Sequence, residues 1–211
     1  MRKTALPTFQ EENDLWQQGY LYVAGIDEAG RGPLAGPVVA AAVILPNQFR
    51  AKWKKLVNDS KQLTADTREM LFLHIQEVAI SFGVGITDAA TIDTRGIAKA
   101  GRLAMKKAVD QLDPVPDYLL VDFFNVPEIS LPQKGIVHGD CISFSIACAS
   151  IIAKVSRDRM MVEMDRTYPE YKFAEHKGYG TPEHLECLKR YGPSPIHRCS
   201  FQPVKELMML L

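Results

Sequence analysis

Two apolar segments separated by a glycine-rich turn constrain the fold of this chain more than any other feature. Residues 20–27 and 37–45 are rich in Val, Ile and Ala and have the length of strands. Only the turn that contains Gly30, Arg31 and Gly32 separates them. We therefore expect the two segments to pair as antiparallel neighbours in one sheet.

The remainder of the chain alternates between helical and strand patterns. Apolar residues at helical spacing predict helices, and short apolar runs predict strands. The helices are expected over 64–79, 95–112, 141–168 and 182–191, and the further strands over 80–86 and 117–121. This alternation predicts an α/β fold with a mixed sheet flanked by helices.

Composition divides the chain into three parts. Residues 1–19 form a polar lead-in with a short helix, and 20–168 carry the pattern of a core. Over 169–211, Gly, Pro, His and aromatic residues become frequent, which predicts a small C-terminal helical extension. Hydrophobic residues make up 46% of the 211 residues, enough for one sizeable core.

Net charge and cysteine content limit the possible functions. The chain has 25 basic and 25 acidic residues, so nucleic-acid binding would need a local surface rather than bulk charge. The four cysteines form no C-x-x-C pair, which favours reduced thiols. The N-terminus lacks the apolar region of a signal peptide, and no apolar run reaches membrane-spanning length. We expect a soluble, cytoplasmic monomer with no membrane contact.

Acidic residues occur where several predicted elements begin or end. Asp27 and Glu28 lie at the end of the first apolar segment, where two buried carboxylates are costly without a cation. Asp122 follows the strand that ends at Val121, and Asp140 precedes the longest helical pattern. Taken singly, Asp122 is explained as a turn residue and Asp140 as a helix N-cap. Together they resemble the sites that open α/β sheets build at strand ends.

The chemistry of these acids indicates which metal they would bind. Carboxylate oxygens without a His or Cys partner favour Mg²⁺ or Mn²⁺ over Zn²⁺. Successive strand residues point to opposite faces, so Asp27 and Glu28 share a site only under one condition. The strand must end or twist strongly at Glu28, or Glu28 must contribute through its backbone carbonyl.

The segment Asp27-Glu28-Ala29-Gly30-Arg31-Gly32-Pro33 resembles the signature of the type 2 ribonuclease H family. Other segments match blocks of that family in the same order. They are Asn58-Asp59-Ser60-Lys61-Gln62-Leu63, Leu120-Val121-Asp122, His138-Gly139-Asp140, 149–158, Lys177-Gly178-Tyr179-Gly180-Thr181 and 192–198. The resemblance is to bacterial ribonuclease HII, because residues 1–19 are too few for the additional N-terminal domain of ribonuclease HIII.

The resemblance implies a ribonuclease H-like fold and a set of site residues. It implies that the 169–211 extension contributes to substrate binding, that Gly30, Arg31 and Gly32 sense a ribonucleotide 2′-OH largely through backbone groups, and that Tyr179 stacks on a sugar. Without the resemblance, Tyr179 is better explained as a packing residue of a loop. The implied metal ligands, for two divalent ions (Mn²⁺ or Mg²⁺), are Asp27, Glu28, Asp122 and Asp140.

The resemblance also implies an activity and its nucleic-acid partner. The expected enzyme is an endonuclease that hydrolyses RNA in RNA/DNA hybrids and nicks duplex DNA 5′ of an embedded ribonucleotide. It would leave 5′-phosphate and 3′-hydroxyl ends by two-metal-ion catalysis. Such an activity removes RNA primers and misincorporated ribonucleotides during DNA replication and repair.

Several basic and terminal residues have less specific roles. Lys61, Lys154, Arg157 and Lys177 are candidates for phosphate contacts or for balancing the acids, although most lysines are simply solvated. The C-terminal residues 207–211 could dock a replication clamp. A helix that returns to the core explains them better, because Lys205 disrupts the spacing of a clamp-binding peptide.

Three alternative functions remain open at this point. The first is a metal-independent ribonuclease that uses two of the five histidines as acid and base. The second is a non-catalytic module that binds hybrids. The third is a different metal-dependent nuclease on the same fold, since a fold does not determine one function.

Overall fold

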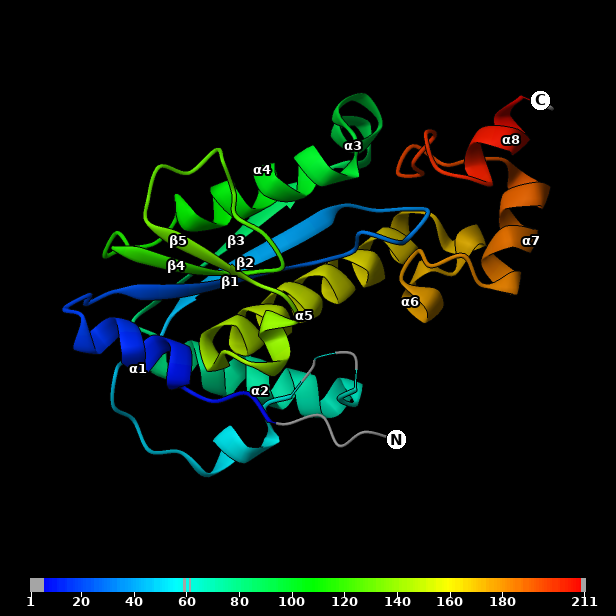
Figure 1. Ribbon diagram of the computed structural model, residues 1–211. Coiled ribbons are helices and arrows are strands. Elements are labelled where there is room, and N and C mark those ends of the chain that lie inside the picture. Colours follow the sequence, from blue (N-terminus) through cyan, green and yellow to red (C-terminus); the bar gives the residue numbers. More distant parts are fainter. Residues whose placement is uncertain (1–5, 59, 61, 210–211) are drawn as a thin grey trace.

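The computed structural model describes residues 6–58, 60 and 62–209. Within this part of the chain, five strands form one sheet in the order β3-β2-β1-β4-β5 (Figure 1). The strands are β1 (Val23–Ala29), β2 (Val38–Ile44), β3 (Ser81–Thr87), β4 (Tyr118–Asp122) and β5 (Gln133–Ile136). The first three are antiparallel neighbours, whereas β4 runs parallel to β1 and β5 runs parallel to β4. The predicted mixed sheet and the predicted pairing of the first two segments are therefore confirmed.

Helices cover both faces of the sheet, with α4 on one side and α5 and α2 on the other (Figure 1). The longer helices are α1 (Gln10–Gln17), α2 (Ala65–Val78), α4 (Ile97–Val109), α5 (Phe144–Thr167) and α7 (Pro182–Tyr191). The shorter ones are α3 (Ala89–Arg95), α6 (Phe173–His176), α8 (Val204–Met208) and the 3-10 turns Lys52–Leu56, Gly139–Cys141 and Pro169–Tyr171. None of the helices in the described residues has the length and apolar composition to cross a membrane.

Side chains of β1 alternate between the two layers, and this alternation positions the site. Ala24 and Ile26 pack in the core beneath α4. Gly25 faces α5, where a Cβ atom would lie 2.2 Å from the backbone carbon of Ser145. The missing side chain thus lets α5 lie directly on β1, and Asp27 belongs to the same face as Gly25.

The predicted lead-in packs against the start of α5. Glu12 of α1 is buried, and its carboxylate accepts hydrogen bonds from the hydroxyls of Ser143 and Ser145 and from the Ser145 amide. The Phe9 ring stacks on Phe144 at 4.5 Å. The first amides of a helix carry partial positive charge, which stabilises this buried carboxylate.

Two expectations about element boundaries are corrected, and one strand was not predicted. The long helix begins at Phe144 rather than Cys141, because Ser143 supplies its N-cap, and Asp140 lies in the preceding 3-10 turn. The explanation of Asp140 as an N-cap is therefore wrong. The predicted helix 95–112 is interrupted at Gly96, which has a φ of 78° and lies between the end of α3 and the start of α4. Strand β5 was not predicted, since its four residues show no apolar alternation.

The C-terminal segment folds back onto the turn that follows β1. Helix α7 has the predicted bounds and is capped by the Thr181 hydroxyl. Leu34 of the turn packs with Leu188 and Val204, and Leu207 lies against this cluster. The extension therefore borders the end of the sheet at which the acidic residues lie (Figure 1).

Candidate active site

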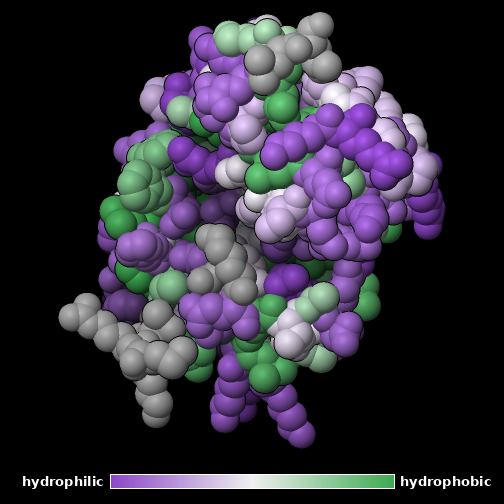
Figure 2. Space-filling view, turned by 90° about the vertical axis from the view of Figure 1, so that its right-hand side faces the viewer, coloured by the Kyte–Doolittle hydropathy of each residue, from purple (hydrophilic) through white to green (hydrophobic). Residues whose placement is uncertain are grey.

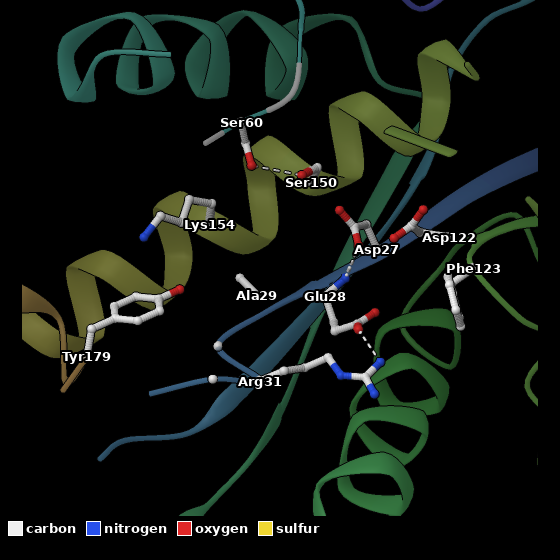
Figure 3. Close-up of a pocket in the computed structure, with 12 residues that line it drawn as sticks. Asp27, Glu28, Ala29, Arg31, Ser60, Asp122, Phe123, Ser150, Lys154 and Tyr179 are labelled. Carbon is white, nitrogen blue, oxygen red and sulfur yellow. Dashed lines mark hydrogen bonds and ion pairs between the residues drawn. The ribbon is translucent and has the colours of Figure 1, made fainter. Parts of the chain in front are cut away.

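A cavity of about 400 Å³ opens where the end of β1, the end of β4 and the middle of α5 meet. Figure 2 views the molecule from this side and shows a hollowed face with many hydrophilic residues. Figure 3 shows the side chains around the cavity. The lining residues are Asp27, Glu28, Ala29, Gly30, Arg31, Gly32, Ser60, Asp122, Phe123, Ser150, Lys154 and Tyr179.

The parallel pairing of β1 with β4 sets Asp27 beside Asp122. The last paired residues are Ile26 and Val121, so the two acids occupy the next position on neighbouring strands. Residues in register on adjacent strands point to the same face, here the face covered by α5. Two carboxylates far apart in the sequence thus lie at one edge of the cavity (Figure 3).

This arrangement destabilises the ionised form of the Asp27 carboxylate. Its side chain is 6% exposed, and its Oδ1 accepts a hydrogen bond of 2.6 Å from the Glu28 amide. Burial raises its pKa well above the ordinary value, and the negative charges of Glu28 and Asp122 raise it further. A hydrogen bond from Ser150 acts in the opposite direction without cancelling these effects. A bound cation would relieve the repulsion.

Glu28 reaches the cavity from the opposite side of the strand. Strand β1 continues to Ala29, so the side chains of Asp27 and Glu28 diverge (Figure 3). The Glu28 carboxylate pairs with Arg31 at 3.0 Å, and the Arg31 guanidinium lies 5.7 Å from the centre of the Phe124 ring. Because β4 ends at Asp122, nothing in the sheet separates Glu28 from the cavity on this edge.

Asp140 is the one predicted acid that does not line the cavity. It is 8% exposed and follows Gly139, whose amide donates a hydrogen bond of 2.7 Å to Asp122 Oδ1. The structure thus brings Asp27, Glu28 and Asp122 to one cavity. Asp140 lies outside it, next in sequence to Gly139, whose amide binds Asp122. As the described side chains are arranged, no three His, Cys, Asp or Glu residues are grouped closely enough to hold a metal ion.

The donor set nevertheless fits a hard divalent cation. The acids that line the cavity offer carboxylate oxygens, and no imidazole or thiol lies among the described lining residues. Oxygen ligands of this kind suit Mg²⁺ or Mn²⁺. The raised pKa of Asp27 is the independent sign that positive charge would stabilise this group of acids.

Sequence reasoning assigned no role to Arg198, which holds the Gly30-Arg31-Gly32 turn. This residue lies between α7 and α8 in the sequence, and its side chain is fully buried. Burial and the nearby charge of Arg157 lower its pKa to about 9. It donates hydrogen bonds to the backbone carbonyls of Gly30, Arg31, Pro33, Gly36 and Pro37. An arginine 168 positions from its acceptor gives no local signal in the sequence.

Arg157 of α5 forms a second buried support for this region. Its guanidinium donates to the carbonyls of Ala35, Pro37 and Lys177. The prediction that Arg157 contacts phosphate is therefore wrong, because the side chain is fully buried and its donors are used by the backbone. Gly30 has a φ of 93°, and a Cβ there would lie 2.1 Å from Arg157 Nε, so only glycine fits.

Tyr179 and Lys154 form the end of the cavity nearest the C-terminal extension. The Tyr179 ring is 42% exposed, and the Lys154 ammonium lies 5.7 Å from its centre. Burial lowers the pKa of Lys154, whose ammonium is 2.7 Å from the Asp158 carboxylate. Both residues line the cavity, and the Tyr179 ring is the more exposed of the two. Lys61, which was predicted to contact substrate, lies outside the described residues.

A chain of histidines fixes the backbone of Tyr179. His184 Nδ1 lies 2.8 Å from the Tyr179 carbonyl, and His184 Nε2 lies 3.0 Å from His197 Nε2. The Ser194 amide donates to His197 Nδ1, so His197 donates from Nε2 and His184 donates from Nδ1. None of the chain's histidines is among the described residues that line the cavity. The structure therefore gives no support to histidine acid–base chemistry there.

The chain is similar to ribonucleases of one family. The family model described as ribonuclease HII matches residues 24–204. A ribonuclease HII of Dehalococcoides mccartyi is 59% identical over 95% of each chain. One of Desulfitobacterium hafniense is 56% identical and covers 93% of this chain and 75% of its own length.

Solved structures give the same result at the level of the fold. Ribonuclease H2 from Pyrococcus horikoshii has a TM-score of 0.74 and 27% identity, covering 90% of this chain and 98% of its own. A complex of PCNA with ribonuclease HII from Archaeoglobus fulgidus has a TM-score of 0.72 and 27% identity, covering 86% and 96%. Bst-RNase HIII, solved with Mn²⁺, has a TM-score of 0.67 at 21% identity, covering 92% and 71%. The predicted ribonuclease H-like fold is thus confirmed.

Proposed function

The chain belongs to the ribonuclease HII family, and from this premise we propose that the cavity beside Asp27 and Asp122 is where it cuts RNA joined to DNA. The protein is an endoribonuclease of the ribonuclease H class, and its substrate is nucleic acid. The proposed reaction is hydrolysis of the RNA strand of a hybrid, or nicking of duplex DNA 5′ of an embedded ribonucleotide. Its products carry 5′-phosphate and 3′-hydroxyl ends.

One observation carries this proposal. The parallel register of β1 and β4 puts the buried Asp27 beside the partly buried Asp122, and burial followed by the charges of Glu28 and Asp122 raises the pKa of Asp27. A buried carboxylate with a raised pKa in a cavity is a candidate cation ligand. The glycine turn and an exposed tyrosine line the same cavity, so a phosphate near the acids would have its sugars within reach of both.

Ribonucleases of this class depend on divalent cations, and the proposed ligands here are Asp27, Glu28, Asp122 and Asp140. Two bound Mg²⁺ or Mn²⁺ ions would supply the Lewis acidity that activates a water and stabilises the leaving 3′ oxygen. The chain itself supplies ionised carboxylates on both sides of the cavity edge. Asp27 must lose its proton for this role, so binding should weaken as pH falls through its raised pKa.

The substrate side of the cavity is proposed to distinguish RNA from DNA. Arg198 holds the carbonyls of Gly30 and Arg31, and the small residues of the turn let a sugar approach the remaining backbone groups. These groups are proposed to sense the 2′-OH, which separates RNA from DNA. Tyr179 would stack on a sugar, and Lys154 would contact a phosphate.

A duplex with one internal ribonucleotide tests the proposal. The wild-type protein with Mn²⁺ or Mg²⁺ should nick it once on the 5′ side of the ribonucleotide and leave all-DNA duplex intact. Asp27→Asn should reduce the rate by at least about 100-fold, since it removes a charged ligand of the catalytic cations. The rate is measured by gel separation of end-labelled strands.

The control and the alternative functions are separated in the same assay. Asp110→Asn, a surface change at the C-terminal cap of α4 where Asp110 pairs with Lys106, should keep full activity. Equal cutting of all-DNA duplex, or an active Asp27→Asn protein, would overturn the proposal. Cutting that survives a chelator and leaves cyclic phosphates would indicate metal-independent chemistry. Shortening of the strand from one end would indicate an exonuclease. Binding of the duplex without cutting would indicate a non-catalytic module.

Contact with a replication clamp is proposed as a secondary property of the C-terminus. The ribonuclease HII of Archaeoglobus fulgidus, 27% identical, was solved in complex with PCNA. In this chain Val204 is buried and Leu207 packs on the core, whereas Met208 and Met209 are exposed. Residues 210–211 of the predicted docking segment lie outside the described residues.

A further inference from the structure

Phe123 is an exposed aromatic residue in the wall of the cavity, directly after Asp122. Its side chain is 55% exposed, and its one ring contact within the described part of the chain is an edge-on approach to Phe124 at 5.2 Å between centres. Burial therefore gives this large apolar ring little stabilisation. The proposed roles of the acids, the glycine turn and Tyr179 do not use it.

The backbone at Phe123 is also strained. Its φ is 72°, a left-handed value that bulky side chains rarely adopt. The Phe124 amide donates to the Asp122 carbonyl at 3.0 Å, so Phe123 is the central residue of a γ-turn with positive φ, which is the rarer and less stable kind. Glycine would occupy this position without the steric cost.

The neighbouring strands hold this turn in place. The Phe123 amide donates to the Ile136 carbonyl at 2.8 Å, which extends the pairing of β4 with β5. Gly135 leaves room for the turn, since a Cβ there would lie 2.8 Å from the Phe124 Cα. The position of the ring is thus set by two strands rather than by a free loop.

A bulky side chain that costs stability and remains exposed beside a reactive site is typical of a group that contacts a ligand. Phe123 and Tyr179 lie at opposite ends of the cavity, with the acids between them (Figure 3). A phosphate in a nucleic-acid strand has a sugar on each side. An aromatic ring at each end therefore matches a strand whose phosphate lies at the acids.

We propose that Phe123 is a substrate-binding residue that packs against the sugar on the side of the scissile phosphate opposite Tyr179. This inference rests on the proposed function, because it assumes that the phosphate lies near Asp27 and Asp122. The ring supplies apolar contact area without hydrogen bonds, so it accepts a ribose or a deoxyribose. It contributes to the hold on the strand, and the choice of RNA is left to the glycine turn.

Replacing Phe123 by glycine tests the inference, because relief of backbone strain should raise stability whereas loss of the ring contact should weaken substrate binding. Phe123→Gly removes the ring and relieves the positive φ, so the melting temperature should stay the same or rise. The KM for the duplex with one ribonucleotide should rise about tenfold, as when one aromatic stacking partner is lost. Phe123→Trp keeps an aromatic face and should restore most of the affinity.

A second measurement separates this inference from the proposed function. Binding of the duplex is measured by fluorescence anisotropy with Asp27→Asn protein and with the Asp27→Asn, Phe123→Gly double variant. The added Phe123→Gly change should weaken binding by the same factor by which it raises KM. Tyr191→Ala removes another exposed aromatic, outside the cavity lining, and should change neither quantity. If wild-type protein cuts the duplex but Phe123→Gly leaves KM and binding unchanged, the inference is overturned. If wild-type protein fails to cut, the proposed function fails.

Discussion

Asp27 is the residue at which fold and chemistry conflict most directly. It lies on a buried strand beside Asp122, and burial followed by the charges of Glu28 and Asp122 raises its pKa. Ionisation is therefore less favourable in the folded protein than in the unfolded chain. Sites that bind cations commonly keep such groups, because the stability lost without the ion returns when the ion binds.

Replacing Asp27 by asparagine should stabilise the protein in a chelator near pH 7.5. A raised pKa means that the ionised group opposes folding above its unfolded pKa, and that this cost disappears as pH falls through the folded pKa. Asparagine removes the charge and keeps an oxygen for the Glu28 amide. The melting temperature should rise by about 2–4 °C, the shift that about 1 kcal/mol produces at this size.

The control for this substitution is again Asp110→Asn, which removes one partner of an exposed ion pair and should shift the melting temperature by less than about 2 °C. With Mn²⁺ in excess, wild-type protein should gain more stability than Asp27→Asn, since only the carboxylate binds the ion well. A lower melting temperature for Asp27→Asn in chelator would contradict the argument.

At the scale of elements, the C-terminal extension supports the turn that follows β1. Arg198 lies after α7, yet its guanidinium serves five carbonyls between Gly30 and Pro37. Arg157 of α5 joins the same turn to the loop that carries Tyr179. The turn thus has no independent structure: two buried guanidinium groups from distant elements determine its shape.

Arg198→Lys should destabilise the protein by about 2–4 kcal/mol, measured as the free energy of unfolding in urea. An ammonium group keeps the charge but has three donors, so it cannot replace a planar fork that reaches five carbonyls. Cutting of the duplex with one ribonucleotide should fall as the turn loses its support. Arg190→Lys, on the exposed side of α7, is the matched control. A loss below about 0.5 kcal/mol, the level of ordinary surface changes, would show that Arg198 is not a support.

At the scale of the whole molecule, the binding of nucleic acid and the pH dependence of stability have separate sources. The chain is neutral, so its hold on nucleic acid must come from local groups, with moderate salt dependence. We expect the acid limit of stability to come instead from two buried histidines in the extension. Burial lowers the pKa of His184 to about 4 and that of His197 to about 3, from an ordinary value of 6.5.

Acidification from pH 7 to pH 5 should therefore lower the free energy of unfolding, because the two histidines outweigh the opposite contribution of Asp27, whose raised pKa makes its cost smaller as pH falls. Both histidines have depressed pKa values, so the unfolded chain binds more protons below about pH 6.5, and stability falls as pH falls. Each residue contributes up to about 1.4 kcal/mol per pH unit in this range. Protonation would also put two N–H groups against each other between the two rings.

His197→Asn removes one titrating group and keeps an oxygen as acceptor for the Ser194 amide. The slope of unfolding free energy against pH, measured in urea between pH 7 and pH 5, should fall by about half of the histidine contribution. His74→Asn, which changes a partly exposed histidine on α2, should leave the slope unchanged. An unchanged slope in His197→Asn would rule out this source of acid sensitivity.

The sequence by itself determined the types and most of the bounds of the elements, since apolar periodicity and caps are local properties. It predicted helix α7, the first strand pair and the acidic residues at element ends. It also carried the family resemblance, because that depends on short ordered segments. The exceptions have local causes: Ser143 replaces Asp140 as a cap, and β5 is too short and polar to show a strand pattern.

Tertiary structure alone decided which of these residues meet. The register between β1 and β4 sets Asp27 beside Asp122, whereas strand geometry turns Glu28 to the other face. The role of Arg198 and the strained exposure of Phe123 likewise depend on elements distant in the chain. Pairing register and buried long-range hydrogen bonds are set by the packing of the whole core, so no local pattern of residues encodes them.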